Sequence, residues 1–231
     1  MSTAPPAAET FTIAVCLFQG AQLIDFAAPI DIIGALEGVN RTKYWTAFGL
    51  EPPQKQLDFT YLACDKEPVK PSTGPLLTSD NTYDEVLASG KQFDIIFVPG
   101  GMQGPDEVEP SLIKFLAVQV PQTKYTLAVC TGSWLLAIAG VLDGRRATTN
   151  KASFKVIQAA TSKQIQWVPK ARWVVDGNLW TSSGVTAGID MSAAWLEEFV
   201  GLETAGKIAA MVEYKRRNQD EDEFAAVYGL V

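Results

Sequence analysis

The sequence contains no histidine at any of its 231 positions. Imidazole is the usual general base for cysteine and serine nucleophiles and the commonest side-chain ligand of divalent metals. Its absence excludes Cys-His and Ser-His catalysis and any metal centre that is built on imidazole. Whatever chemistry the chain performs must use other proton carriers.

Cysteine and long apolar runs are also scarce. The three cysteines, Cys16, Cys64 and Cys130, are odd in number and far apart, which does not fit a disulfide framework and favours a reducing, cytoplasmic compartment. No apolar run approaches the ~20 residues that span a bilayer. Residues 1–10 lack the basic and apolar regions of a signal peptide, so we interpret them as a disordered leader.

Basic residues are too few to form a surface for polyanions. The chain has 19 Lys and Arg against 26 Asp and Glu, a net charge of −7, and neither nucleic acid nor an anionic membrane is an expected partner. At 47% hydrophobic content it can bury one sizeable core. We expect a single domain over residues 11–217 and an acidic tail over 218–231.

Apolar runs of strand length alternate with helical patterns along the chain, which predicts an α/β fold with a mostly parallel sheet. Strands are expected at 11–18, 43–50, 93–98 and 124–129, and helices at 25–39, 111–120, 131–142, 188–201 and 203–218. The stretch 51–79 contains five prolines and is expected to be irregular, with short strands and turns. Asp176-Gly177-Asn178 predicts a small β-hairpin. The cluster Lys215–Arg217 is expected in the last turn of the final helix, where cations suit the dipole.

Cys130 follows an expected strand and precedes an expected helix, in the order Val129-Cys130-Thr131-Gly132. This order is typical of a nucleophile elbow, in which a sharp turn presents the side chain at the carboxyl edge of the sheet. The helix N-terminus would favour a thiolate and lower the thiol pKa. The alternative is that Cys130 is a small buried core residue. Cys16, inside a strand, is assigned to the core, and Cys64 has no expected role.

Four ordered motifs extend this interpretation: LIDFAAPIDII, DIIFVPGG, AVCTGSWLLAIAGVLDGRRATT and VVDGNLWTSSGVTAGID. With them the sequence resembles the ThiJ/PfpI superfamily, which is related to class I glutamine amidotransferases, and within it most resembles the isonitrile hydratases. The resemblance runs from about Phe11 to Tyr214. It implies a flavodoxin-like three-layer sandwich and a homodimer.

The resemblance assigns roles to particular residues. Cys130 matches the family nucleophile and Thr131 the residue after it, while Asp25 matches the acid that approaches the cysteine from the first βα loop. Gly100 and Gly101 match the turn whose backbone N–H lies beside the thiolate. The alternative for Asp25 is a helix N-cap. Because a carboxylate beside a thiolate is a like-charge pair, we expect the productive state of the pair to have a neutral Asp25 that donates to sulfur.

Several positions depart from the family pattern. Asn150, followed by Lys151, stands where relatives usually carry histidine after RATT, and Ala28 replaces a glycine in the acidic loop. Ser182 and Ser183 stand where relatives often have glycines. These changes surround the expected pocket, so a changed substrate is compatible with retained Cys130 and Asp25 chemistry.

Aromatic and sulfur-containing side chains are candidates to line the pocket, although such residues more often fill the core of a sandwich. The candidates are Trp134, Met102, Phe26 and Trp180. Asp190 is expected to cap or brace the last helices.

The resemblance implies hydration of an isonitrile to an N-substituted formamide through a Cys130 thioimidate, with Asp25 as proton donor and no cofactor. Amide hydrolysis is disfavoured because no histidine is present to protonate an amine leaving group. Three alternatives stay open: a glyoxalase-like reaction on 2-oxoaldehydes, a hydratase or lyase that acts on a different specialised metabolite, and a cysteine redox sensor in which Cys130 oxidises to a sulfinic acid. The expected partner is a small electrophile.

Overall fold

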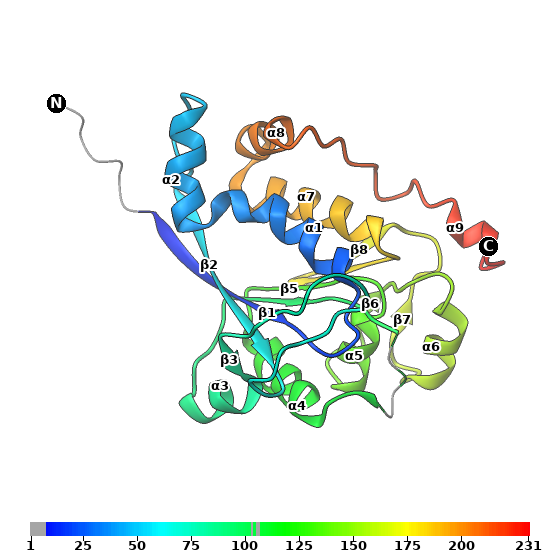
Figure 1. Ribbon diagram of the computed structural model, residues 1–231. Coiled ribbons are helices and arrows are strands. Elements are labelled where there is room, and N and C mark those ends of the chain that lie inside the picture. The colour runs from blue at the N-terminus through cyan, green and yellow to red at the C-terminus, as the bar shows by residue number, and fades with distance from the viewer. Residues whose placement is uncertain (1–7, 103, 105–106) are drawn as a thin grey trace.

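The computed structural model describes residues 8–102, 104 and 107–231, so most of the expected leader lies outside the described residues. A seven-stranded sheet in the order β3-β2-β1-β4-β5-β9-β8 forms the centre of the molecule (Figure 1). Neighbouring strands pair in parallel except β8 and β9, which are antiparallel. The strands are β1 (Glu9–Cys16), β2 (Lys55–Ala63), β3 (Asn81–Thr82), β4 (Ile95–Val98), β5 (Tyr125–Ala128), β8 (Trp173–Asp176) and β9 (Leu179–Ser182).

Helices cover both faces of the sheet and complete a three-layer sandwich (Figure 1). On one face lie α1 (Leu23–Ile33) and α7 (Thr186–Val200), and on the other α3 (Tyr83–Ser89), α4 (Pro110–Gln119) and α5 (Gly132–Ile138). The other elements are η1 (Gly34–Leu36), α2 (Gly38–Ala47), η3 (Val120–Gln122), β6 (Arg146–Ala147), α6 (Phe154–Ala160), β7 (Gln166–Trp167), α8 (Leu202–Met211) and α9 (Phe224–Val227). The α/β fold predicted from the sequence is confirmed. None of the helices in the described ranges has the length and apolarity needed to cross a membrane.

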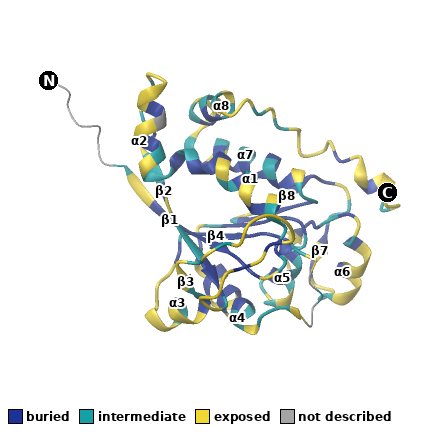
Figure 2. Ribbon diagram, in the orientation of Figure 1, coloured by how far each residue is buried: buried dark blue, intermediate teal, exposed yellow. Residues whose placement is uncertain are grey.

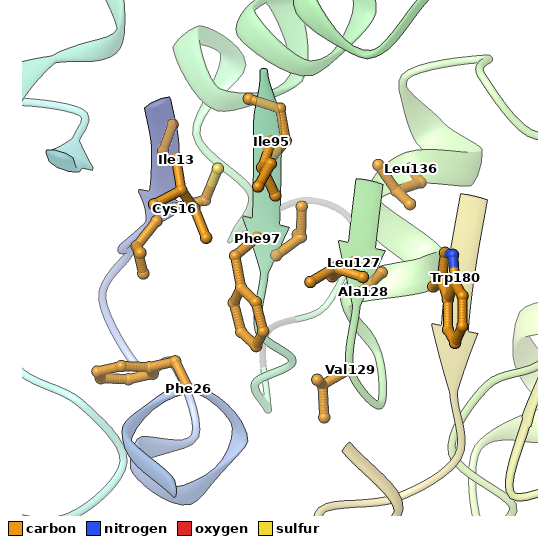
Figure 3. Close-up of a cluster of buried hydrophobic side chains, with 14 of the residues drawn as sticks. Ile13, Cys16, Phe26, Ile95, Phe97, Leu127, Ala128, Val129, Leu136 and Trp180 are labelled. Carbon is orange, nitrogen blue, oxygen red and sulfur yellow. The ribbon is translucent and has the colours of Figure 1, made fainter. Parts of the chain in front are cut away.

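The core lies on both faces of the central strands, which is why these strands appear in the sequence as continuous apolar runs. Burial is concentrated along the sheet (Figure 2), and every residue of β4 is buried. Figure 3 shows Ile13, Ile95, Leu127 and Trp180 on four neighbouring strands, with Leu136 packing from α5. This packed sheet holds the strand ends that carry the site.

The strand predicted at 43–50 is wrong, because α2 covers most of that stretch. Its buried residues Arg41 and Trp45 are four positions apart, so one helical face packs inward. The region 51–79, expected to be irregular with short strands and turns, contains the nine-residue strand β2, which pairs in parallel with β1 along its length. The five prolines of the region 51–79 precede or follow β2 and do not interrupt it.

The hairpin prediction is confirmed, with Gly177 at a φ of 60° in the turn between β8 and β9. The prediction for Lys215–Arg217 is wrong, because α8 ends at Met211 and these residues lie beyond it. Arg216 instead pairs with Glu197 of α7 at 2.9 Å. Residues after the cluster lead to α9, so part of the expected tail is helical.

Candidate active site

Cys130 occupies the turn between β5 and α5 with a φ of 58°, a conformation that few residues other than glycine adopt. Its N–H donates to the Ser183 carbonyl at 3.1 Å. Its carbonyl accepts from the Ser133 hydroxyl at 2.9 Å and from the Thr149 hydroxyl at 3.1 Å. Three separate segments therefore hold the strained turn, as a nucleophile elbow requires.

Asp25 lies in the first turn of α1 and is fully buried. Its Oδ2 accepts the Gly100 N–H at 3.0 Å, and no N–H or O–H donor of the described residues reaches Oδ1. Gln22 is the N-cap of α1, so the capping alternative for Asp25 is wrong. Burial raises the pKa of Asp25 to about 6, although the Gly100 N–H and the Cys130 thiol oppose the shift.

The pKa of Cys130 is shifted opposite to the sequence-based expectation. Burial and the charge of Asp25 raise it to about 12, although the Asn150 amide and the Thr131 and Val185 N–H groups act to lower it. The expectation of a lowered pKa is wrong because it considered the helix N-terminus and not the desolvation of a sulfur whose residue is only 7% exposed. Between the two pKa values the pair holds one proton. A nucleophilic thiolate forms when that proton moves within the pair to Asp25.

Asn150 donates from Nδ2 to Cys130 Sγ at 3.2 Å. Its Oδ1 accepts the N–H groups of Ala152 at 2.9 Å and Ser153 at 3.3 Å. These two contacts fix the orientation of the amide, so that its N–H and not its oxygen faces the sulfur. Asn150 therefore stabilises negative charge on Cys130 but cannot exchange a proton with it.

Thr131 joins the elbow to the turn after β4. Its hydroxyl accepts the Gly101 N–H at 2.9 Å and donates to the Gly101 carbonyl at 2.8 Å. The two glycine positions predicted from the sequence thus contact different partners: Gly100 binds Asp25, and Gly101 binds Thr131. Together they fix the separation between the acid and the nucleophile.

A cavity of about 450 Å³ opens over Cys130, a size suited to a small molecule. It is lined by Gln22, Gly101, Met102, Gly104, Cys130, Thr131, Trp134, Asn150, Ala152, Ser153 and Val185. Met102 is 87% exposed at its rim. Phe26 is absent from this lining and instead lines a separate cavity of about 640 Å³ beside Phe59 and Tyr61 of β2.

Other residues singled out in the sequence lie outside the cavity over Cys130. Trp180 is buried in the core on β9, and neither Ser182 nor Ser183 lines the cavity over Cys130. Asp190 accepts hydrogen bonds from the Arg172 side chain, the Tyr214 hydroxyl and the Arg217 N–H, and so it braces α7 against the C-terminal segment.

Some lining residues were not found from the sequence. No motif in the sequence marks four of them as lining residues, and their positions depend on long-range packing: Gln22, Ala152, Ser153 and Val185. Val185 has a φ of 40° immediately before α7, which no sequence pattern marks. Across the described residues, no three Cys, Asp or Glu side chains are arranged to hold a metal ion.

Replacing Gly100 with alanine should disable the site. The added Cβ would lie 2.7 Å from the Thr131 backbone nitrogen and 2.8 Å from both Asp25 Oδ2 and Cys130 Cβ, so the acid and the nucleophile must separate. We expect the rate at which iodoacetamide alkylates Cys130 to differ from that of the wild type, and catalytic turnover to fall at least about 100-fold. Small displacements at a reacting centre have effects of this size. Gly206→Ala, in α8 with nothing near its added Cβ, is the matched control and should leave both rates unchanged. Wild-type turnover in Gly100→Ala would contradict this geometry.

The fold and the site define a class: α/β sandwiches that carry a cysteine at the elbow after a central strand, with an acid supplied by the first helix. Within that class the assignment is specific, because residues 11–198 match the DJ-1/PfpI family. The chain belongs to the DJ-1/PfpI family, which confirms the resemblance found in the sequence.

Relatives within the family have different activities. The chain is 32% identical over 203 residues to an isonitrile hydratase of Pseudomonas putida, covering 87% of this chain and 78% of that protein. It is also 32% identical over 161 residues to the transcriptional regulator GbdR of Pseudomonas aeruginosa, covering 70% of this chain but only 42% of the regulator. A ThiJ/PfpI family protein of Pseudomonas syringae shares the fold, with a TM-score of 0.70 at 22% identity over 98% of this chain and 88% of that structure. The flavodoxin-like sandwich is thereby confirmed.

Proposed function

We propose that this chain is a cofactor-independent hydratase that converts isonitriles to N-substituted formamides. The observation that carries the proposal is the pairing of Cys130 with the buried Asp25 beneath a cavity sized for a small molecule. The 32% identity to an isonitrile hydratase over most of both chains supports the choice of substrate class.

The first step uses the single proton that the pair holds. With that proton on Asp25, the Cys130 thiolate adds to the terminal carbon of the isonitrile, and Asp25 gives its proton to the same carbon. The product is a thioimidate bound to sulfur, and Asp25 is left as a carboxylate. The Asn150 N–H and the backbone N–H of Thr131 stabilise the thiolate before attack.

The second step hydrates the thioimidate. Asp25 takes a proton from water as the oxygen adds to the carbon, and that proton passes to the substrate nitrogen. Collapse of the tetrahedral adduct expels the Cys130 thiolate, and the hydroxyl proton returns to Asp25. The sum is one isonitrile and one water converted to one formamide, with both residues restored.

The lack of histidine suits this reaction better than amide hydrolysis. Isonitrile hydration releases no amine, so no separate acid is needed to protonate a leaving group, and one carboxyl group can serve every proton transfer. Asn150 contributes only hydrogen bonding, since its Nδ2 donates to Cys130 Sγ and its Oδ1 accepts two backbone N–H groups. Asp25 therefore carries all the proton transfers of the proposed cycle.

The test is formamide production from small isonitriles such as cyclohexyl and p-nitrophenyl isocyanide, followed by chromatography. We expect catalysed formation of the corresponding formamide, with no added metal or cofactor. A folded protein whose Cys130 still alkylates but which forms no formamide from any isonitrile would overturn the proposal. Lactate from methylglyoxal in the same assay would then identify the glyoxalase-like alternative.

A further inference from the structure

Asn150 is followed by a buried lysine that contacts the C-terminal segment. Lys151 is 3% exposed, and its Nζ donates to the Thr148 hydroxyl at 2.7 Å. The same Nζ forms an ion pair with Asp222 Oδ2 at 3.3 Å, and both side chains are 2% exposed. A residue far along the chain thus reaches the short segment that carries Asn150.

Asp222 is itself held rigidly. Its Oδ2 also accepts the Ala171 N–H at 3.0 Å, and its Oδ1 accepts the N–H groups of Phe224 at 3.1 Å and Ala225 at 3.3 Å. With three backbone donors and one ammonium group, the carboxylate has a fixed position and a compensated charge. It is a firm anchor for Lys151.

The segment 148–151 has two sets of contacts. Thr149 and Asn150 face the nucleophile, through the hydrogen bonds to the Cys130 carbonyl and Sγ. Thr148 and Lys151 bind away from it, since the Thr148 hydroxyl also donates to the Val168 carbonyl at 2.8 Å. Fixing the outer pair therefore fixes the orientation of the inner pair.

We propose that Asp222 is a positioning residue for the active site: by anchoring Lys151 it holds the 148–151 segment so that Asn150 Nδ2 stays on Cys130 Sγ. The proposal rests on the proposed role of Cys130 as the nucleophile. A buried ion pair adds little net stability over apolar residues of the same size, because desolvation offsets the attraction. The Lys151–Asp222 pair has a fixed geometry and lies next to Asn150 in the chain, so we assign it a role in positioning Asn150 and not in stability.

The test measures the reactivity of the Cys130 thiol and not turnover. Its result therefore decides the positioning role of Asp222 even if the chain does not hydrate isonitriles. Iodoacetamide alkylation of Cys130 is followed by mass spectrometry from pH 6 to 10, well below the unfolding temperature of each variant. We expect Asp222→Asn to slow alkylation about tenfold at neutral pH and to shift its pH profile upward, because loss of one hydrogen bond to a charged group has an effect of this size. Asn150→Ala should give the same result.

A double variant distinguishes positioning from general loosening of the fold. In the double variant Asp222→Asn with Asn150→Ala, alkylation should be no slower than in Asn150→Ala alone. Both changes remove the same contact, that of Asn150 Nδ2 with Cys130 Sγ, so their effects should not add. Glu223→Gln, which breaks the exposed Arg217–Glu223 pair one residue away, is the matched control and should react as wild type. Lys151→Met, which removes the buried cation, tests the same link if Asp222→Asn does not fold. Wild-type alkylation in a folded Asp222 or Lys151 variant, or effects that multiply in the double variant, would overturn the proposal.

Discussion

Replacing Cys130 with alanine should reduce formamide production from isonitriles to the uncatalysed rate. The remaining site would still hold substrate, but it would have no nucleophile to form the thioimidate, and no histidine in the chain can substitute by activating water directly. We expect a fall in kcat/KM of at least about 10³, in keeping with the effect of removing a catalytic nucleophile. Product formation over time, by chromatography, measures it.

The other two cysteines provide controls for this variant. Cys64 is half-buried outside the site, and Cys64→Ala should retain wild-type turnover. Cys16 lies buried in β1, where burial raises its pKa and its side chain forms a hydrogen bond with Tyr83. Cys16→Ala should therefore alter the stability of the fold and leave turnover unchanged. Activity that survives loss of Cys130 and disappears only with Cys16 would contradict the assignment of the nucleophile.

Asp25→Asn should greatly reduce turnover while it stabilises the fold at neutral pH. The amide accepts the Gly100 N–H as the carboxylate does, but it cannot give a proton to the isonitrile carbon or take one from water, and loss of such a group costs about 10² to 10⁴ in rate. Kinetics with a small isonitrile and thermal unfolding of the same samples measure the two effects. A variant that retains wild-type turnover would remove Asp25 from the mechanism.

The stability effect depends on pH with a definite sign. Asp25 has a pKa of about 6 in the folded chain against a reference value of 3.8, so the folded state holds the proton more tightly than the unfolded state. The stability that the protonated carboxyl provides is present below pH 3.8 and is lost as the pH rises to about 6, in total about 3 kcal/mol. Asp25→Asn should therefore unfold near the wild-type temperature at pH 4 and several degrees above it at pH 7. An equal difference at both pH values would show that the cause is not titration of Asp25.

The parts of the site encoded locally could be predicted from the sequence. The strand and helix on either side of Cys130 are strongly patterned, so their junction was placed correctly and the structure shows the strained turn there. Asp25 lies far from Cys130 in the sequence, and only the family resemblance related them. Asn150 was expected near the pocket, but its contact with Cys130 Sγ was not, and the direction of its amide depends on the N–H groups of Ala152 and Ser153.

The errors have a common physical cause: tertiary packing outweighed local preference. The stretch 43–50 was expected to form a strand, but most of it belongs to α2, which buries Arg41 and Trp45 on one helical face. The pKa of Cys130 was misjudged because the extent of burial does not follow from neighbouring residues. The partnership of Lys151 with Asp222 joins distant segments and has no local signal.

The C-terminal segment also has a consequence for association between chains. The outermost strand of a sheet presents backbone groups that can pair with a strand of another molecule and begin aggregation. Here Gln219 lies along the start of β8: its carbonyl accepts the Arg172 N–H at 2.8 Å, and its side chain donates to the Trp173 carbonyl at 2.8 Å. The segment that carries Asp222 thus occupies backbone groups at the sheet edge, where they would otherwise be open to strand addition.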